Sequence, residues 1–176
     1  MAINPDIESE MASEANPEMD LVSGFREMTI DDVPAIMEIE KQVYTHPWTR
    51  GIFLDCMRVG YNCWVYGESD ELLAYGLVSV AVNEAHILNI CVSPHAQGRG
   101  LGKLMLYKLM QLAAERDGNS IFLEVRESNL VAQNLYDQEG FNRIGLRKNY
   151  YPAEDGREDA LVFAKELNLD RISSKE

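Results

Sequence analysis

Apolar and polar positions follow two kinds of spacing along this chain, and each spacing predicts one kind of element. From Gly102 to Asp117 apolar residues recur at helical spacing, and Gly118 then ends the pattern. Strand-like apolar runs precede and follow this stretch, as in Asn62 to Glu68. The predicted helices cover residues 29–43, 49–59, 102–117 and 129–139, and the predicted strands cover 24–28, 62–68, 72–82, 85–92, 121–125, 142–150 and 160–166. A loop is predicted at residues 152–157, between the last two strands.

The order of these elements is βααβββαβαββ, which is an α+β arrangement. We expect one mixed, mostly antiparallel sheet with helices on both faces and a parallel crossover around the helix at 102–117. The expected domain covers residues 24–168, a length that allows one substantial core. Residues 1–23 are polar and acidic and are predicted to be a disordered tail, and residues 169–176 are predicted to form a C-terminal tail.

A glycine-rich segment lies between the strand that ends at Val92 and the next helix. Its residues are Gln97, Gly98, Arg99, Gly100, Leu101, Gly102 and Lys103. Glycines let a ligand approach the backbone, and amides at a helix N-terminus attract anions, so the segment suits a phosphate group. It differs from the P-loop, because Leu104 replaces the hydroxyl residue, and from the dinucleotide motif, because Lys103 replaces the third glycine. A glycine-rich turn that only caps a helix is the alternative.

The net charge of −13 limits the choice of partners. The first 20 residues contain no Lys or Arg, and their acidic residues are Asp6, Glu8, Glu10, Glu14, Glu18 and Asp20. We therefore expect no direct binding of nucleic acid, whereas a basic peptide or a polyamine would be attracted; the charge could also serve solubility alone. No apolar run approaches the roughly 20 residues of a membrane span, and the acidic N-terminus is unlike a signal peptide, so no membrane association is expected.

The three cysteines, Cys56, Cys63 and Cys91, are dispersed and form no Cys-x-x-Cys pair. This pattern is typical of a reducing cytoplasm and argues against a disulfide framework. Because the three histidines also lack metal-ligand spacing, we expect no metal site. The cysteines are interpreted as small buried residues. An acyl-cysteine on Cys91 is disfavoured, since apolar neighbours do not lower the pKa of a thiol.

Two residues in the second half of the chain are candidates for acid–base chemistry. Glu124 interrupts an apolar strand, where partial removal from water would suit a general base; a surface glutamate paired with Arg126 is the alternative. Tyr136 lies on the same face of a predicted helix as Ala132, and its hydroxyl can donate a proton without being charged beforehand. For Tyr136 the alternative is an ordinary core tyrosine.

The pattern Gln-x-x-Gly-x-Gly between a strand and a helix resembles the pyrophosphate loop of the GNAT acetyltransferase superfamily, and the element order is that of the GNAT fold. The resemblance is closest to the bacterial ribosomal-protein-alanine N-acetyltransferases and covers about residues 25–165. It rests on Leu-Glu-Val-Arg-x-Ser-Asn from Leu123, on Leu-Tyr-x-x-x-Gly-Phe from Leu135, and on His-Pro-Trp ending at Trp48. The most specific block begins with Tyr-Tyr-Pro at Tyr150 and ends with Asp-Gly-Arg-Glu-Asp-Ala.

This resemblance implies an acyltransferase that moves acetyl from acetyl-CoA to the N-terminal alanine of a small-subunit ribosomal protein, by direct transfer in a ternary complex. It implies Glu124 as the general base and Tyr136 as the general acid. The implied cofactor-binding residues are Ile90, Cys91, Val92, Gln97, Gly98, Arg99, Gly100, Leu101, Gly102, Lys103 and Asn129. The predicted peptide groove contains Trp48, Tyr150, Tyr151 and Asp159, for which packing of a hairpin is the alternative.

The expected partner is a basic N-terminal peptide, the expected compartment is the cytoplasm, and the expected state is a monomer. An α-amine of pKa about 8 is roughly 10% neutral at pH 7, against about 0.04% for a lysine amine of pKa about 10.4. A single carboxylate base therefore suits an N-terminus better than a lysine. The open alternatives are other protein N-termini, a small polyamine-like amine, and a non-catalytic acetyl-CoA-binding module.

Overall fold

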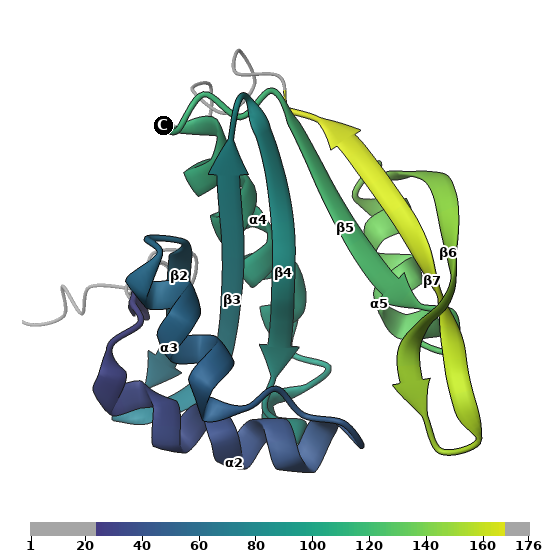
Figure 1. Ribbon diagram of the computed structural model, residues 1–176. Helices are drawn as coiled ribbons and strands as arrows, with labels where there is room; N and C mark the ends of the chain where they lie inside the picture. Colours follow the sequence, from purple (N-terminus) through teal and green to yellow (C-terminus); the bar gives the residue numbers. More distant parts are fainter. Residues whose placement is uncertain (1–23, 168–176) are drawn as a thin grey trace, which may run out of the picture.

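The computed structural model describes residues 24–167. The tails predicted for residues 1–23 and 169–176 lie outside the described residues, so both stay predictions. The described chain forms a seven-stranded sheet with helices on both faces (Figure 1). Its elements follow one another in the predicted order, which confirms the α+β class.

The sheet is mixed and mostly antiparallel, as predicted. In sheet order its strands are β1 (Phe25–Glu27), β2 (Asn62–Glu68), β3 (Glu71–Ala81), β4 (Glu84–Val92), β5 (Ser120–Arg126), β7 (Gly156–Glu166) and β6 (Asn142–Ala153). Neighbouring strands pair antiparallel, except that β4 and β5 pair parallel. A helix connects β4 to β5 because parallel neighbours need a crossover rather than a hairpin.

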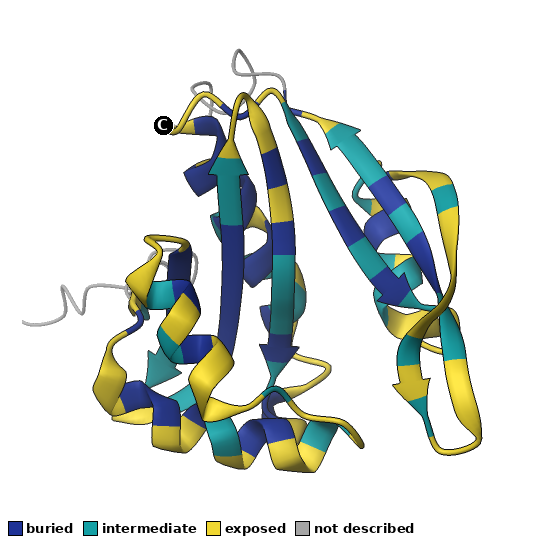
Figure 2. Cartoon of the chain, viewed as in Figure 1, coloured by how far each residue is buried: buried dark blue, intermediate teal, exposed yellow. Residues whose placement is uncertain are grey.

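The helices cover both faces of the sheet and enclose two apolar clusters. They are α2 (Val33–Val43), α3 (Arg50–Arg58), α4 (Leu101–Ala114) and α5 (Leu130–Gln138), with short 3-10 turns η1 (Ile30–Asp32) and η2 (Pro94–Ala96). One cluster joins α2 and α3 to the sheet and the other joins α4 and α5 to it (Figure 2). Adjacent residues of β3 pack in different clusters on the two faces of the sheet, since Ala74 packs towards α4 and Tyr75 towards α2. No helix within residues 24–167 is long and apolar enough to cross a membrane.

Strands β4 and β5 diverge part-way along their length. Their parallel pairing ends at Ile87 and Leu123. Against β3, the register of β4 shifts so that Leu88 is an extra, bulged residue. Beyond this bulge β4 and β5 separate (Figure 1), and the described chain supplies no ladder partner for the edge of β4 that faces β5. This divergence leaves β4 without a partner strand on that side at the centre of the sheet, where side chains of Tyr44 and Gln97 donate hydrogen bonds of 3.5 and 3.2 Å to the Ile90 and Val92 carbonyls.

The hairpin of β6 and β7 extends further than the sequence predicts. We expected a loop at residues 152–157, but the strands stay paired up to a turn at residues 154–155. The local signals for a loop are a proline and an Asp-Gly pair, yet a proline is tolerated on an edge strand such as β6. The guanidinium of Arg157 donates hydrogen bonds of 2.6 Å to the carbonyls of Asn149 and Tyr150. These bonds provide partners for backbone carbonyls in the irregular part of β6. The predicted loop is therefore wrong.

Candidate active site

The glycine-rich segment connects η2 to α4 and presents backbone amides. Gly98 and Gly100 have φ values of 77° and 83°, in the left-handed region that favours glycine. A Cβ on either residue would meet no heavy atom within 4 Å, so the backbone conformation, and not crowding, requires glycine. Gly100 is the N-cap of α4 and has no capping side chain, which leaves the first amides of the helix for another acceptor. The segment therefore has the form of an anion site.

The two basic side chains of this segment already have carboxylate partners. Arg99 donates hydrogen bonds of 2.9 and 2.8 Å to Glu68 at the end of β2. Lys103 lies 2.7 Å from Glu139, which follows α5. Burial opposes the ionisation of Glu139, but hydrogen bonds from Lys103 and Tyr107 outweigh it and lower the pKa of this carboxyl. The segment thus offers backbone amides to an anion, while its two basic side chains are already paired with carboxylates.

A cavity of about 710 Å³, here called the larger cavity, extends from this segment along β4 to α5. The predicted cofactor-binding residues in its wall are Ile90, Cys91, Val92, Gln97, Gly98, Gly100, Leu101, Gly102, Lys103 and Asn129. Arg99 does not line the cavity, because its guanidinium pairs with Glu68. Asn129 also caps α5, since its Oδ1 accepts a hydrogen bond of 3.1 Å from the Ala132 amide.

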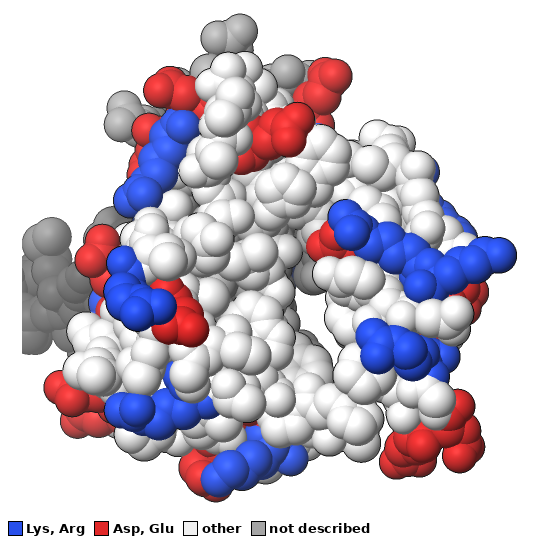
Figure 3. Space-filling model, in the orientation of Figure 1, with Lys and Arg blue, Asp and Glu red and all other residues white. Residues whose placement is uncertain are grey.

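A second cavity of about 340 Å³, here called the smaller cavity, adjoins the first. Its wall contains Trp48 from the connection between α2 and α3, Glu124 from β5, and Tyr151 from β6. The residues that line both cavities are Tyr44, His46, Ile90, Arg126, Asn129, Ala132, Tyr136 and Pro152. The face shown in Figure 3 is hollowed between the part that carries β4 and the hairpin of β6 and β7. The surface is mostly uncharged on the β4 side of the hollow, whereas Lys and Arg side chains gather on the hairpin side.

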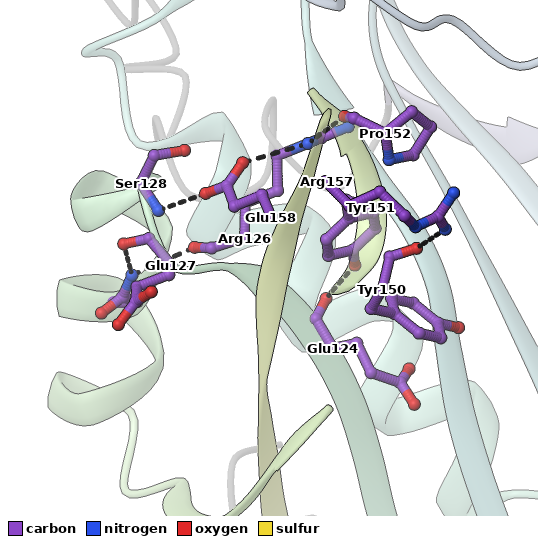
Figure 4. A network of polar contacts seen from close by, with 10 residues as sticks. Glu124, Arg126, Glu127, Ser128, Tyr150, Tyr151, Pro152, Arg157 and Glu158 are labelled. Carbon is purple, nitrogen blue, oxygen red and sulfur yellow. Dashed lines mark hydrogen bonds and ion pairs between the residues drawn. The ribbon is translucent and has the colours of Figure 1, made fainter. Parts of the chain in front are cut away.

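Glu124 lies on β5 in the wall of the smaller cavity, with its side chain 21% exposed. Its Oε1 lies 3.0 Å from the guanidinium of Arg147 on β6. The expected alternative pairing with Arg126 is wrong, because Arg126 contacts Glu158 instead. The Tyr151 hydroxyl donates a hydrogen bond of 3.2 Å to the backbone carbonyl of Glu124, while the Glu124 carboxylate points away from it (Figure 4).

Tyr136 of α5 lies in the wall that both cavities share. Its ring packs against Phe141 and Phe163, with centroid distances of 5.7 and 6.0 Å. Burial raises the pKa of its hydroxyl to about 12, so this group keeps its proton at neutral pH. Tyr136 thus combines the packing of a core residue with a position at the junction of the cavities.

The residues predicted for the peptide groove separate into two pairs. Trp48 and Tyr151 line the smaller cavity, and Tyr150 and Asp159 line neither cavity. Tyr150 is 42% exposed, and its ring lies edge-on to that of Tyr151 at 4.9 Å. Asp159 accepts a hydrogen bond of 2.8 Å from the amide of Asn149 and so supports the irregular part of β6.

A polar network joins the hairpin to the turn between β5 and α5 (Figure 4). Arg126 donates a hydrogen bond of 2.9 Å to the Pro152 carbonyl, lies 3.1 Å from Glu158, and stacks 4.5 Å from the ring of Tyr151. Glu158 in turn accepts a hydrogen bond of 2.6 Å from the Ser128 amide. Burial opposes the ionisation of Glu158, but the hydrogen bonds from Ser128 and Arg126 outweigh it and lower its pKa. The network fixes Tyr151 and Pro152 in the cavity walls.

Comparison with known proteins identifies the family. The sequence model of the acetyltransferase (GNAT) family matches residues 33–141. The chain belongs to the GNAT family of acetyltransferases. It is 38% identical over 134 residues to the ribosomal protein bS18-alanine N-acetyltransferase of Haemophilus ducreyi, a match that covers 76% of this chain and 92% of the relative. It is 35% identical over 138 residues to the enzyme of that name from Escherichia coli, covering 78% of this chain and 93% of the relative.

The solved structures confirm the GNAT fold. The crystal structure of the ribosomal-protein-S18-alanine N-acetyltransferase from Escherichia coli has a TM-score of 0.76 and 33% sequence identity to this chain. The match covers 82% of this chain and 93% of that structure. The GNAT fold that the element order and the glycine-rich segment predict is therefore the fold of this protein.

The cysteines of this GNAT chain are buried and free of disulfides. Burial raises the pKa of the Cys91 thiol to about 11, so the thiol is protonated at neutral pH although it lines the larger cavity. This confirms the interpretation of the cysteines as small buried residues and leaves Cys91 a poor nucleophile. Among residues 24–167, no group of three His, Cys, Asp or Glu side chains is placed to hold a metal ion.

Sequence reasoning missed several residues in the walls of this GNAT site. They are Glu40, Tyr44, Asn89, Arg126 and Glu158, together with Arg147, which pairs with Glu124. One signal was available for Glu40, because it lies at helical spacing from Val33, Ile36 and Met37 on the apolar stripe of α2. A carboxylate on such a stripe is unusual enough to mark it as a candidate.

Proposed function

We propose that this protein transfers the acetyl group of acetyl-CoA to the N-terminal α-amino group of a small-subunit ribosomal protein whose first residue is alanine. The observation that carries the proposal is the junction of two cavities at Tyr136, one lined by the glycine-rich segment and the other by Glu124. Direct transfer requires such an arrangement, because donor and acceptor must be held together in reacting geometry. The names of the two relatives, at 38% and 35% identity, support this choice of acceptor.

The larger cavity fits acetyl-CoA in size and chemistry. Its volume of about 710 Å³ lies within the range of small-molecule sites. The amides of the glycine-rich segment suit the pyrophosphate, and the free edge of β4 from Ile90 to Val92 suits an extended amide chain, which would pair as an added strand does. When bound, acetyl-CoA supplies an acyl group that is activated as a thioester.

Glu124 is the proposed general base. It takes the proton from the α-ammonium group of the peptide, directly or through water, and so frees the nitrogen lone pair for attack. The ion pair of 3.0 Å with Arg147 orients the carboxylate beside the smaller cavity. Backbone N–H groups of β4 near Ile90 to Val92 are proposed to stabilise the negative charge that develops on the carbonyl oxygen.

Tyr136 is the proposed general acid. Because burial raises its pKa to about 12, the hydroxyl is still protonated when the carbon–sulfur bond breaks. It donates a hydrogen bond and then its proton to the departing sulfur, and it regains a proton as the attacking nitrogen gives up its second proton to become the amide. The aromatic walls at Trp48 and Tyr151 would hold the first residues of the peptide.

Thiol release from acetyl-CoA, measured with short basic peptides that differ only in residue one, tests this proposal. The peptide that begins with alanine should be turned over fastest, and the same peptide with a blocked N-terminus should release no thiol. Faster turnover of spermidine than of every peptide would contradict the proposal that the acceptor is a protein N-terminus. Tight binding of acetyl-CoA without turnover of any amine would contradict the activity and favour a binding module.

A further inference from the structure

One carboxylate beside the smaller cavity has no part in the proposed chemistry. Glu40 of α2 has an exposed fraction of 0%. Removing a carboxylate from water is costly unless hydrogen bonds replace its hydration. Within residues 24–167, Glu40 forms no ion pair with Lys, Arg or His, so neutral donors alone stabilise it. Such an arrangement calls for a structural or functional reason.

Three donors share the two carboxylate oxygens of Glu40. Its Oε2 accepts a hydrogen bond of 2.7 Å from the backbone amide of Trp48. Its Oε1 accepts hydrogen bonds from the Tyr75 hydroxyl and, at 3.2 Å, from the side-chain amide of Asn89. Burial raises the pKa of Tyr75, so its hydroxyl stays a donor. Three hydrogen bonds to the two oxygens of one side chain fix it in one orientation.

Two of these donors, Trp48 and Asn89, belong to segments that form the wall of the smaller cavity. Trp48 lies in the connection between α2 and α3, and Asn89 directly follows the β4 bulge. The hydroxyl of Tyr44 adds a second link, since it lies 3.4 Å from Asn89 Oδ1 and 3.5 Å from the Ile90 carbonyl. Glu40 and Tyr44 thereby tie the connection between α2 and α3 to the strand that lies between the two cavities.

We propose that Glu40 is a positioning residue that holds Trp48 and the segment around it in the wall of the smaller cavity. The inference rests on the proposed function, because it assigns this wall to the peptide acceptor. Glu40 is fully buried, and both of its carboxylate oxygens are engaged by the Trp48 amide, the Tyr75 hydroxyl and the Asn89 side chain. Losing its bond to Trp48 should therefore weaken the peptide's binding, whereas the glycine-rich segment, which lines only the larger cavity, keeps its geometry.

Replacement of Glu40 by Gln tests the inference with little change in volume. When the glutamine oxygen faces Tyr75 and Asn89, its NH₂ group faces the Trp48 amide, so two donors oppose each other. We expect the peptide KM to rise about tenfold in Glu40→Gln, with acetyl-CoA affinity within about twofold of wild type. Tyr75→Phe removes one donor from Oε1 and keeps the bond to Trp48, so the peptide KM should rise by only about twofold to threefold.

The matched control is Glu38→Gln on the same helix. Glu38 is exposed and pairs with Lys41 at 2.7 Å, so its replacement should leave both substrate affinities and the melting temperature unchanged. A peptide KM in Glu40→Gln equal to that of the control would overturn the inference. So would a parallel loss of peptide and acetyl-CoA affinity, because it would indicate general damage to the fold.

Fluorescence tests the position of Trp48 without any turnover. In a Trp64→Phe background Trp48 is the remaining tryptophan of the chain, and Glu40→Gln should make its emission more accessible to acrylamide. Unchanged quenching would overturn the inference. If the wild-type protein acetylated no peptide, the proposed function would fail, and the quenching result would still decide whether Glu40 anchors Trp48.

Discussion

The two cavities of this protein are built in different ways. Backbone forms much of the larger cavity, through left-handed glycines, the start of α4 and the free edge of β4. Side-chain contacts support the smaller cavity, where the Glu40 carboxylate binds the Trp48 amide and Arg126 stacks on the ring of Tyr151. The backbone features of the larger cavity come from one short stretch of sequence. The wall of the smaller cavity depends on residues that are distant in sequence and that only the fold brings together.

The largest effect is expected at the junction, from Glu124→Gln. Without a general base, kcat should fall by about 10²–10⁴ while acetyl-CoA binding is kept. The loss should shrink as the pH rises, because a larger fraction of a peptide α-amine of pKa about 8 is then already neutral. A pH profile of kcat for the mutant and wild type measures this. Turnover close to wild type at pH 7 would remove Glu124 from the mechanism.

A smaller loss at the junction is expected from Tyr136→Phe, which keeps the ring that packs against Phe141 and Phe163. We expect kcat to fall by about 10–100-fold, with unchanged acetyl-CoA affinity. Since burial raises the pKa of Tyr136 to about 12, the hydroxyl stays protonated below that pH. Between pH 8 and 10, the activity of the wild type should therefore not decline relative to that of the mutant. If such a Tyr136-dependent decline appeared, the role of proton donor would be wrong.

An effect confined to the larger cavity is expected from Gly100→Ala. At a φ of 83° an L-residue is strained by about 1–2 kcal/mol, and relief of the strain would move the amides at the start of α4. We expect the Kd for acetyl-CoA to rise about fivefold to tenfold, measured by titration calorimetry, while the peptide KM is unchanged.

Gly51→Ala on α3 is the matched control for this substitution. A Cβ at Gly51 would meet Thr49 at 3.7 Å, an ordinary contact, and alanine favours a helix by about 1 kcal/mol. The melting temperature should therefore rise slightly, with unchanged acetyl-CoA binding. Equal effects of both substitutions on the Kd for acetyl-CoA would mean that the glycine-rich segment does not hold the cosubstrate.

The smallest effect is expected from Glu139→Gln, which would release Lys103 in the wall of the larger cavity. The Kd for acetyl-CoA should fall about twofold at low salt, and the gain should vanish at high salt because exposed charges are screened. Glu115→Gln near the other end of α4 is a suitable control, since Glu115 is exposed and bonds only to Gln111 among the side chains described. Weaker acetyl-CoA binding in Glu139→Gln would show that this carboxylate supports the site instead.

The sequence predicted the elements well where apolar spacing is strong. The helix expected at 102–117 is α4, Leu101–Ala114, and the strand expected at 85–92 is β4, Glu84–Val92. The prediction failed at residues 152–157, where proline and Asp-Gly are local loop signals. Hydrogen bonds from Arg157 to the backbone of β6 extend the pairing there, and no local pattern contains that information.

By itself, the sequence determined the α+β class, the glycine-rich segment and the two candidates for acid–base chemistry, because periodicity and short motifs are local properties. The tertiary structure decided which side chains face one another. It paired Glu124 with Arg147 rather than Arg126, turned Arg99 away from the larger cavity, and buried Glu40 among donors from three other segments. Those outcomes depend on strand register and on the divergence of β4 and β5, which arise only when distant segments pack together.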